Sequence, residues 1–302
     1  MGWIAEALKK ADEERATVLG PPRSHPHRTG PIGPTDDLFQ DRPEDSAAPP
    51  PGPPATEDVR PPDADLPRAA ERPDHSLVVL HGQEPVLTEQ YRTLRTRLLS
   101  QNTRAHSQMI AVTSSLPGEG KSVTTSNLGI VLAEVKHLHV LLVDADFRRS
   151  SLARLFGLKP HPGLVEVLQG QADIDQVVQR TIVENLDLMP AGLTDGVNPA
   201  ELLSSKRAAA VFDELRDRYG YVLADTPPCV DVADAGIVGQ LADGMLMILR
   251  LGKTPQPLAK RIVQMLQASR VNLIGCVLIG SEEASFPYGY DDYGYSGRDH
   301  HR

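Results

Sequence analysis

The chain has 302 residues, 40% of them hydrophobic, which is enough for one sizeable α/β core with additional segments. Its formal net charge of −9 argues against nucleic-acid binding through a basic surface. No apolar run approaches the ~20 residues of a membrane-spanning helix, and the charged N-terminus is unlike a secretory signal. Cys229 and Cys276 lack metal-ligand spacing and stand in apolar surroundings, so we expect buried thiols in a reduced, cytoplasmic protein.

Composition divides the chain into four parts. Residues 1–18 predict a short amphipathic helix, whose apolar side could dock a partner or touch a membrane surface, and could equally pack weakly on the core. Residues 19–77 hold more than half of the 26 prolines and few large apolar side chains, which predicts a disordered linker. Residues 78–281 alternate apolar and amphipathic stretches and form the predicted folded domain. Residues 282–302 turn to Gly, Asp and Tyr and predict a flexible tail.

The folded region predicts a doubly wound α/β fold, with a mostly parallel sheet flanked by helices. Strands are predicted at residues 109–113, 140–144, 186–190, 221–225, 245–251 and 273–279. Helices are predicted at residues 84–100, 122–135, 200–218 and 257–269. Nearly continuous apolar strands that alternate with helices are typical of a parallel sheet covered on both faces.

The predicted helix over residues 84–100 has two distinct sides. Its apolar stripe, facing the core, consists of Leu87, Tyr91, Leu94 and Leu98. Glu89, Arg92 and Arg95 follow one another at three-residue spacing on a different side. The simplest interpretation of these charges is intrahelical ion pairing, worth only tenths of a kcal/mol per pair.

A glycine loop between the first predicted strand and the next helix indicates a phosphate site. Gly118 and Gly120 allow the backbone to approach phosphate oxygens, with N–H groups facing the anion at a helix N-terminus. Lys121 supplies charge to the β- and γ-phosphates, and Ser122 supplies a hydroxyl ligand for Mg²⁺. The predicted nucleotide-binding residues are Ser115, Pro117, Gly118, Glu119, Gly120, Lys121, Ser122 and Val123. The strict pattern has Gly where this chain has Ser115, and an ordinary glycine-rich turn is the alternative.

Carboxylates follow two of the predicted strands. Asp144 and Asp146 stand two residues apart and therefore point to the same side, and Asp225 ends another strand. The carboxyl ends of parallel strands line the ligand crevice of such sheets, so these acids and the phosphate loop should meet. We expect ATP and Mg²⁺ there, with Ser122, Asp144 and Asp225 around the metal. Capping of the next helix or turn is the alternative for any one aspartate.

The C-terminal tail is rich in tyrosine. The cluster consists of Tyr288, Tyr290, Tyr293 and Tyr295. From residue 281 to Tyr295 an extended chain reaches ~45 Å, far enough for the site of a neighbouring subunit. These tyrosines are the predicted phosphoacceptors, and an incidental low-complexity tail is the alternative.

Four segments of the chain resemble the bacterial tyrosine kinases of capsule and exopolysaccharide systems. They are residues 117–122, residues 142–148, residues 224–228 and the C-terminal tyrosine cluster. The likeness continues through residues 152–158, 163–168 and 198–203, and covers roughly residues 84–281 with the tail. It implies an ATP-dependent protein-tyrosine autokinase, in which the catalytic residues are Lys121, Asp144, Asp146 and Asp225. By this resemblance Asp144 and Asp146 form a second Walker element, Asp225 is the Walker B acid, and Asp144 helps to deprotonate the tyrosine.

The resemblance also implies partners. Glu89, Arg92 and Arg95 match the family's self-association motif, which implies a ring-like homo-oligomer whose subunits phosphorylate one another. A separate membrane-anchored activator of polysaccharide chain length and a tyrosine phosphatase are further implied partners. The implied location is cytoplasmic, at the inner face of the membrane when a partner recruits the chain.

Two other functions remain open from the sequence. One is a non-kinase ATPase switch of the partition or septum-placement type, which resembles this chain in fold. That branch carries a signature lysine five residues before the loop lysine, where this chain has Leu116. The other is a nucleotide sensor whose tail is phosphorylated by a different kinase.

Overall fold

The computed structural model describes residues 72–102, 107–230 and 233–280. The predicted N-terminal helix, the linker up to residue 71 and the tail from residue 281 lie outside the described residues. The sequence places the start of the folded domain at residue 78, but packing begins earlier. Leu77 is fully buried, and the Asp74 N–H donates to the Leu155 carbonyl at 2.9 Å.

The described elements alternate along the chain in the order expected for a doubly wound fold. The helices are α2 (Val78–His81), α3 (Pro85–Gln101), α4 (Lys121–Ala133), α5 (Leu152–Phe156), α6 (Leu164–Gln169), α7 (Ile174–Val177), α8 (Pro199–Leu203), α9 (Lys206–Arg218), α10 (Asp234–Leu241) and α11 (Gln256–Ala268). The strands are β1 (Gln108–Ser114), β2 (Val140–Asp144), β3 (Gln179–Arg180), β4 (Leu186–Met189), β5 (Tyr221–Asp225), β6 (Gly244–Arg250) and β7 (Leu273–Ile279).

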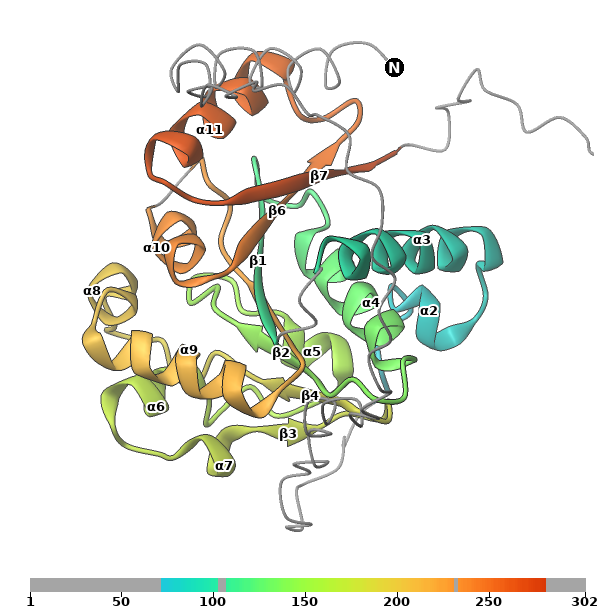
Figure 1. Ribbon diagram of the computed structural model, residues 1–302. Helices are drawn as coiled ribbons and strands as arrows, with labels where there is room; N and C mark the ends of the chain where they lie inside the picture. Colours follow the sequence, from blue (N-terminus) through green and yellow to red (C-terminus); the bar gives the residue numbers. More distant parts are fainter. Residues whose placement is uncertain (1–71, 103–106, 231–232, 281–302) are drawn as a thin grey trace, which may run out of the picture. The chain divides into compact units, whose positions relative to one another are not determined.

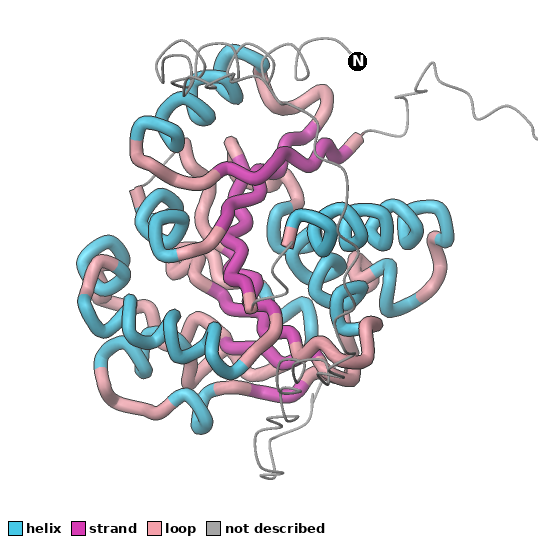
Figure 2. Tube along the Cα trace, viewed as in Figure 1, coloured by secondary structure: helices cyan, strands magenta, loops and turns pink. Residues whose placement is uncertain are grey.

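The strands form one sheet in the order β3-β4-β2-β5-β1-β6-β7, and helices lie on both of its sides (Figures 1 and 2). All neighbours are parallel except β3, which pairs antiparallel with β4. The predicted mostly parallel sheet is therefore confirmed. The sequence missed β3 because two residues are too short to show a strand period.

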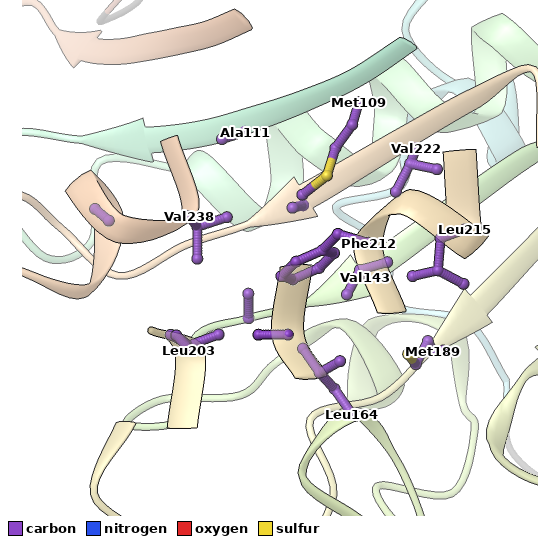
Figure 3. Close-up of a cluster of buried hydrophobic side chains, with 14 of the residues drawn as sticks. Met109, Ala111, Val143, Leu164, Met189, Leu203, Phe212, Leu215, Val222 and Val238 are labelled. Carbon is purple, nitrogen blue, oxygen red and sulfur yellow. The ribbon is translucent and has the colours of Figure 1, made fainter. Parts of the chain in front are cut away.

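Each face of the sheet has its own apolar core. Helices α2 to α5 cover one face, where Leu128, Leu142 and Phe156 are buried. Helices α6 to α11 cover the other, and Figure 3 shows Phe212 and its neighbours on that side. The central strands are buried on both faces, which explains why they read as continuous apolar runs instead of alternating ones.

Two further details differ from the expectations. The predicted helix over residues 200–218 is two helices, because Ser205 ends the continuity: its side chain accepts the Ala208 N–H at 3.0 Å and caps α9. Cys229 is buried as expected, but Cys276 is exposed on the outer strand β7. Within the described ranges, no helix has both the length and the apolarity needed to cross a bilayer.

The register of the strands determines where the site lies. Asp144 at the end of β2 is directly opposite Asp225 at the end of β5. On the other side of β5, Val112 of β1 is level with Asp225, and β1 ends two residues later at Ser114. Because these parallel strands end at the same edge, the loop between β1 and α4 opens beside both carboxylates.

Candidate active site

The glycine loop after β1 has the backbone that a phosphate loop requires. Gly118 and Gly120 have φ of 70° and 81°, a region that residues with a β-carbon rarely adopt. A β-carbon on Gly120 would also lie 2.8 Å from Ile279 Cδ1, so the end of β7 closes against the loop. Helix α4 begins immediately afterwards at Lys121, and its first N–H groups have no partner within the helix. This end of α4 is suited to bind an anion.

Lys121 lies in a pocket of carboxylates. Its Nζ is 2.9 Å from Asp146 Oδ2 and 3.2 Å from Asp225 Oδ2, and its side chain is only 10% exposed. Burial alone would lower the lysine pKa, but the attraction of Asp225 and Asp146 outweighs it and raises the pKa of Lys121. The lysine is therefore held in its charged form.

Ser122 and Asp225 form the candidate metal-binding pair. The Ser122 hydroxyl donates to Asp225 Oδ2 at 2.5 Å, and Thr125 Oγ1 lies 3.5 Å from the other carboxylate oxygen. Complete burial raises the pKa of Asp225, although Lys121 and Ser122 oppose that change. A hydroxyl and a carboxylate at a phosphate loop are oxygen ligands that suit Mg²⁺.

Asp144 has a capping role in the structure. Its Oδ2 accepts the N–H groups of Ser151 and Leu152 at 2.8 and 3.0 Å, and its Oδ1 accepts that of Asp146 at 3.2 Å. Burial, and secondarily the charge of Asp225, raise the pKa of Asp144 to about 7. The carboxylate therefore fixes the chain after β2 and also lies close enough to Asp225 to interact with it.

Asp146 connects the site to residues that the sequence did not single out. Its Oδ1 accepts the N–H groups of Arg148 and Arg149 at 3.2 and 3.0 Å, while Oδ2 contacts Lys121. The Arg148 side chain in turn pairs with Asp234 of α10 at 3.2 Å. Asp234 is buried and far away in sequence, so only the folded chain brings it to this edge.

A second set of contacts fixes the outer side of the loop. Glu119 is fully buried, and its carboxylate accepts the Leu116 N–H at 2.9 Å and the Thr254 hydroxyl. Lys253 Nζ donates to the carbonyls of Pro117 and Gly118. Lys253 and Thr254 both lie in the turn that follows β6. A position just after a strand was the only signal in the sequence, and it does not distinguish them from their neighbours.

These residues fit a nucleotide with its magnesium ion. Ser115 has a buried hydroxyl without a hydrogen-bond partner among the described residues, at the first position of the loop. Within the same residues, no group of three or more His, Cys, Asp or Glu side chains could enclose a metal by itself. Mg²⁺ in phosphate sites usually has one or two protein ligands and completes its shell with water and phosphate oxygens, so this donor set is adequate.

The charged residues of α3 lie at the opposite end of α4 from this loop. Arg92 contacts Glu89 at 2.5 Å, as the intrahelical interpretation expected, but it also contacts Glu134 at 2.8 Å. Arg95 contacts Glu134 at 2.6 Å and donates to the Val131 carbonyl at 2.7 Å. The arginines therefore tie α3 to the C-terminal end of α4, a contact between helices that sequence spacing could not reveal.

Comparisons with known proteins agree with this geometry. An AAA domain family matches residues 107–254. The chain is 34% identical over 226 residues to the tyrosine-protein kinase YwqD of Bacillus subtilis. The matched region covers 75% of this chain and 93% of YwqD. It spans only 27% to 30% of several longer curated tyrosine-protein kinases that it matches.

Solved structures give the same result. The kinase domain of the Escherichia coli tyrosine kinase ETK has a TM-score of 0.66 and 30% identity, over 73% of this chain and 86% of that one. The septum site-determining protein MinD of Pyrococcus horikoshii, complexed with Mg-ADP, has a TM-score of 0.50 and 22% identity, over 57% of this chain and 70% of that one. The likeness to MinD shows a shared P-loop fold alone. The chain itself belongs to the family of bacterial tyrosine-protein kinases, as its motifs predicted.

Proposed function

We propose that this chain uses MgATP to phosphorylate the tyrosines of its own tail, and that it does so between subunits. The observation that carries the proposal is the cluster of Lys121, Asp146 and Asp225 beside the glycine loop, with Ser122 hydrogen-bonded to Asp225. A lysine, a hydroxyl and paired acids at a phosphate loop are the groups that phosphoryl transfer needs.

Each group in this cluster has a role in the proposed reaction. Loop N–H groups and Lys121 hold the β- and γ-phosphates, for which Lys121 must leave its carboxylate partners. Ser122, Asp225 and Asp144 are the proposed environment of Mg²⁺, which would neutralise phosphate charge. A tyrosine hydroxyl attacks the γ-phosphorus in line, and the bond to the leaving ADP oxygen breaks. Asp144 is the proposed acceptor of the phenolic proton, because a carboxylate at this place can act as a general base.

The starting point of the tail supports self-phosphorylation. Strand β7 ends at Ile279, whose side chain lies against Gly120 of the phosphate loop. The acceptor tyrosines, Tyr288 to Tyr295, follow within about sixteen residues, so their range includes a chain's own site and that of a neighbour at ~3.3–3.6 Å per residue. Reach alone therefore leaves cis and trans transfer both feasible, and the experiment must separate them.

Mixing two defective chains separates these routes. A Lys121→Met chain has acceptors but no working site, and a chain with all four tail tyrosines changed to Phe has a site but no acceptors. Transfer between subunits predicts phosphotyrosine on the Lys121→Met chain after both are incubated with MgATP. If each parent is inactive, wild type is active and the mixture stays unmodified, transfer occurs within one chain. Phosphate release by the wild type without phosphotyrosine would instead favour the ATPase switch.

Self-association through α3 is the proposed way to bring subunits together. Glu89 and Arg92 keep exposed side chains, 67% and 40%, despite their pairing within the chain. The Glu89→Ala, Arg92→Ala, Arg95→Ala triple variant should lose a large species in light scattering and keep nucleotide binding. The single variant Glu134→Ala is the control, because it breaks the intrachain pairs of both arginines with α4 while it leaves all three motif side chains. An unchanged oligomer distribution in the triple variant would reject this role.

We further infer a cytoplasmic enzyme that acts with a membrane-anchored partner in polysaccharide synthesis or export, opposed by a tyrosine phosphatase. The support is the family to which the chain belongs. Deletion of the gene should change the amount or chain length of the cell's exported polysaccharide. The Lys121→Met allele should fail to restore it, whereas the wild-type allele should succeed.

A further inference from the structure

The turn that follows β6 reaches across the sheet edge to the phosphate loop. Lys253 Nζ donates to the Pro117 carbonyl at 2.8 Å and to the Gly118 carbonyl at 3.0 Å. It is close enough that a β-carbon on Gly118 would lie 3.1 Å from this ammonium. This lysine is separate from Lys121 and comes from a different part of the chain.

The two carbonyls belong to peptide groups of the phosphate loop itself. The Pro117 carbonyl shares its peptide plane with the Gly118 N–H, and the Gly118 carbonyl shares its plane with the Glu119 N–H. An ammonium at the oxygen end of a peptide group polarises that group and makes its N–H a stronger donor. The charge of Lys253 therefore acts on the N–H groups that would face the phosphates.

The same turn holds the loop through a second side chain. Thr254 donates its hydroxyl to the carboxylate of Glu119, which is fully buried and also accepts the Leu116 N–H. The turn is itself ordered, because the N–H groups of Lys253 and Thr254 donate to the Arg250 carbonyl at 3.1 and 2.9 Å. A loop fixed in this way before the ligand arrives has less conformational freedom to lose on binding.

We propose that Lys253 is a positioning residue for the nucleotide's polyphosphate, acting through the peptide groups of the loop and supported by Thr254. The proposal rests on the nucleotide site of the proposed function and goes beyond it, since it assigns a second lysine to phosphate recognition. The residue does not need to touch the nucleotide. Its role is to orient and polarise donors for the β- and γ-phosphates, and AMP, which lacks both, should depend on it much less.

Calorimetric titration of the full chain with Mg-ADP, and competition with AMP, test this role. Lys253→Met should weaken Mg-ADP binding about tenfold and AMP binding less than about threefold, since charge-assisted hydrogen bonds are the strong ones. Lys253→Arg, which keeps a cationic donor, should recover most of the loss. Lys136→Met is the control, because it removes an exposed lysine from the turn after the C-terminal end of α4, whereas the phosphate loop precedes the N-terminal end. It should leave both affinities unchanged.

Several results would overturn a positioning role for Lys253. The first is an unchanged Mg-ADP affinity in Lys253→Met, or an equal loss for Mg-ADP and AMP. The second is an equal loss in Lys136→Met, which would assign the effect to net charge. The third is a loss that Lys253→Arg does not reduce, which would contradict the part played by the cation. Binding does not require transfer to tyrosine, so a failure of the kinase function would leave the inference standing, whereas a wild-type chain that binds no nucleotide would overturn both.

Discussion

Helix α4 carries a charged cluster at each end, and the two clusters differ mainly in burial. At its first residue Lys121 pairs with Asp146 and Asp225, which are nearly inaccessible. Just past its last residue Glu134 pairs with Arg92 and Arg95 at the surface. In both places the helix end carries the charge that its macrodipole disfavours, a cation at the N-terminus and an anion at the C-terminus. Each charge is held there by opposite charges from other elements.

The difference shows how burial decides what a charged cluster can do. At the surface, hydrogen bonds from Arg92 lower the pKa of Glu134 below its ordinary value. The partial burial of Glu134 opposes this change. Such exposed pairs contribute little to stability and are screened by salt. In the buried cluster, burial raises the pKa of Asp144 and Asp225, and repulsion from a neighbouring aspartate adds to the increase, while Lys121 opposes it. An incoming phosphate or metal ion can change that balance strongly.

The largest effect should follow from loss of the buried lysine. Lys121→Met removes the cation that the phosphates need, and phosphotyrosine formation should fall by at least about 100-fold, the scale of electrostatic groups in phosphoryl transfer. Quantitative anti-phosphotyrosine detection after incubation with MgATP measures it. Glu134→Gln, at the other end of the same helix, is the matched control and should keep the transfer rate per active oligomer within about twofold. Full activity in Lys121→Met would show that the buried cluster is not the site.

A moderate effect should appear in the pH dependence of stability. Asp144 titrates near 7 in the folded chain and near 3.8 in the unfolded chain, so the folded state binds the proton more tightly. Its contribution to stability is fully present below the unfolded pKa and is lost as pH rises through about 7. The free energy of unfolding should therefore fall by about 1.4 kcal/mol between about pH 6 and pH 8 from this group.

Urea unfolding of the nucleotide-free chain in a chelating buffer measures this change. Asp144→Asn should show a shallower slope against pH over the same interval. The slope is the informative quantity, because the substitution also disturbs the hydrogen bonds of Ser151 and Leu152 at every pH. Equal slopes in the two proteins would mean that Asp144 does not titrate in this range.

The smallest effect should come from the exposed cluster. Arg95→Ala removes the ion pair with Glu134 and the hydrogen bond to the Val131 carbonyl at the end of α4. The expected loss in the free energy of unfolding is about 0.5–1 kcal/mol, and it should shrink in high salt. Urea unfolding at low and high ionic strength tests it. A salt-independent loss of several kcal/mol would show that this end of α4 is as tightly coupled as the other.

Much of the site could be predicted because its signals are local. The glycines, Lys121 and Ser122 lie within five consecutive residues, and Asp144 and Asp225 end strands that hydrophobic runs define clearly. The rule that parallel strands share a carboxyl edge then brings them together without any knowledge of the fold's details. The break between α8 and α9 was missed because helical periodicity continues through Ser204 and Ser205, and only the cap of Ser205 marks it.

The sequence by itself determined the alternation of apolar strands with helices, the phosphate loop and the family, since those depend on residues close together or on runs with a clear period. Only the tertiary structure decided which charges meet. Three contacts join segments that are between 42 and 136 residues apart: Glu134 with Arg92, Asp234 with Arg148, and Lys253 with the loop carbonyls. No local pattern encodes such pairs, because they arise from the register of strands and the packing of helices, and these are set by the whole core.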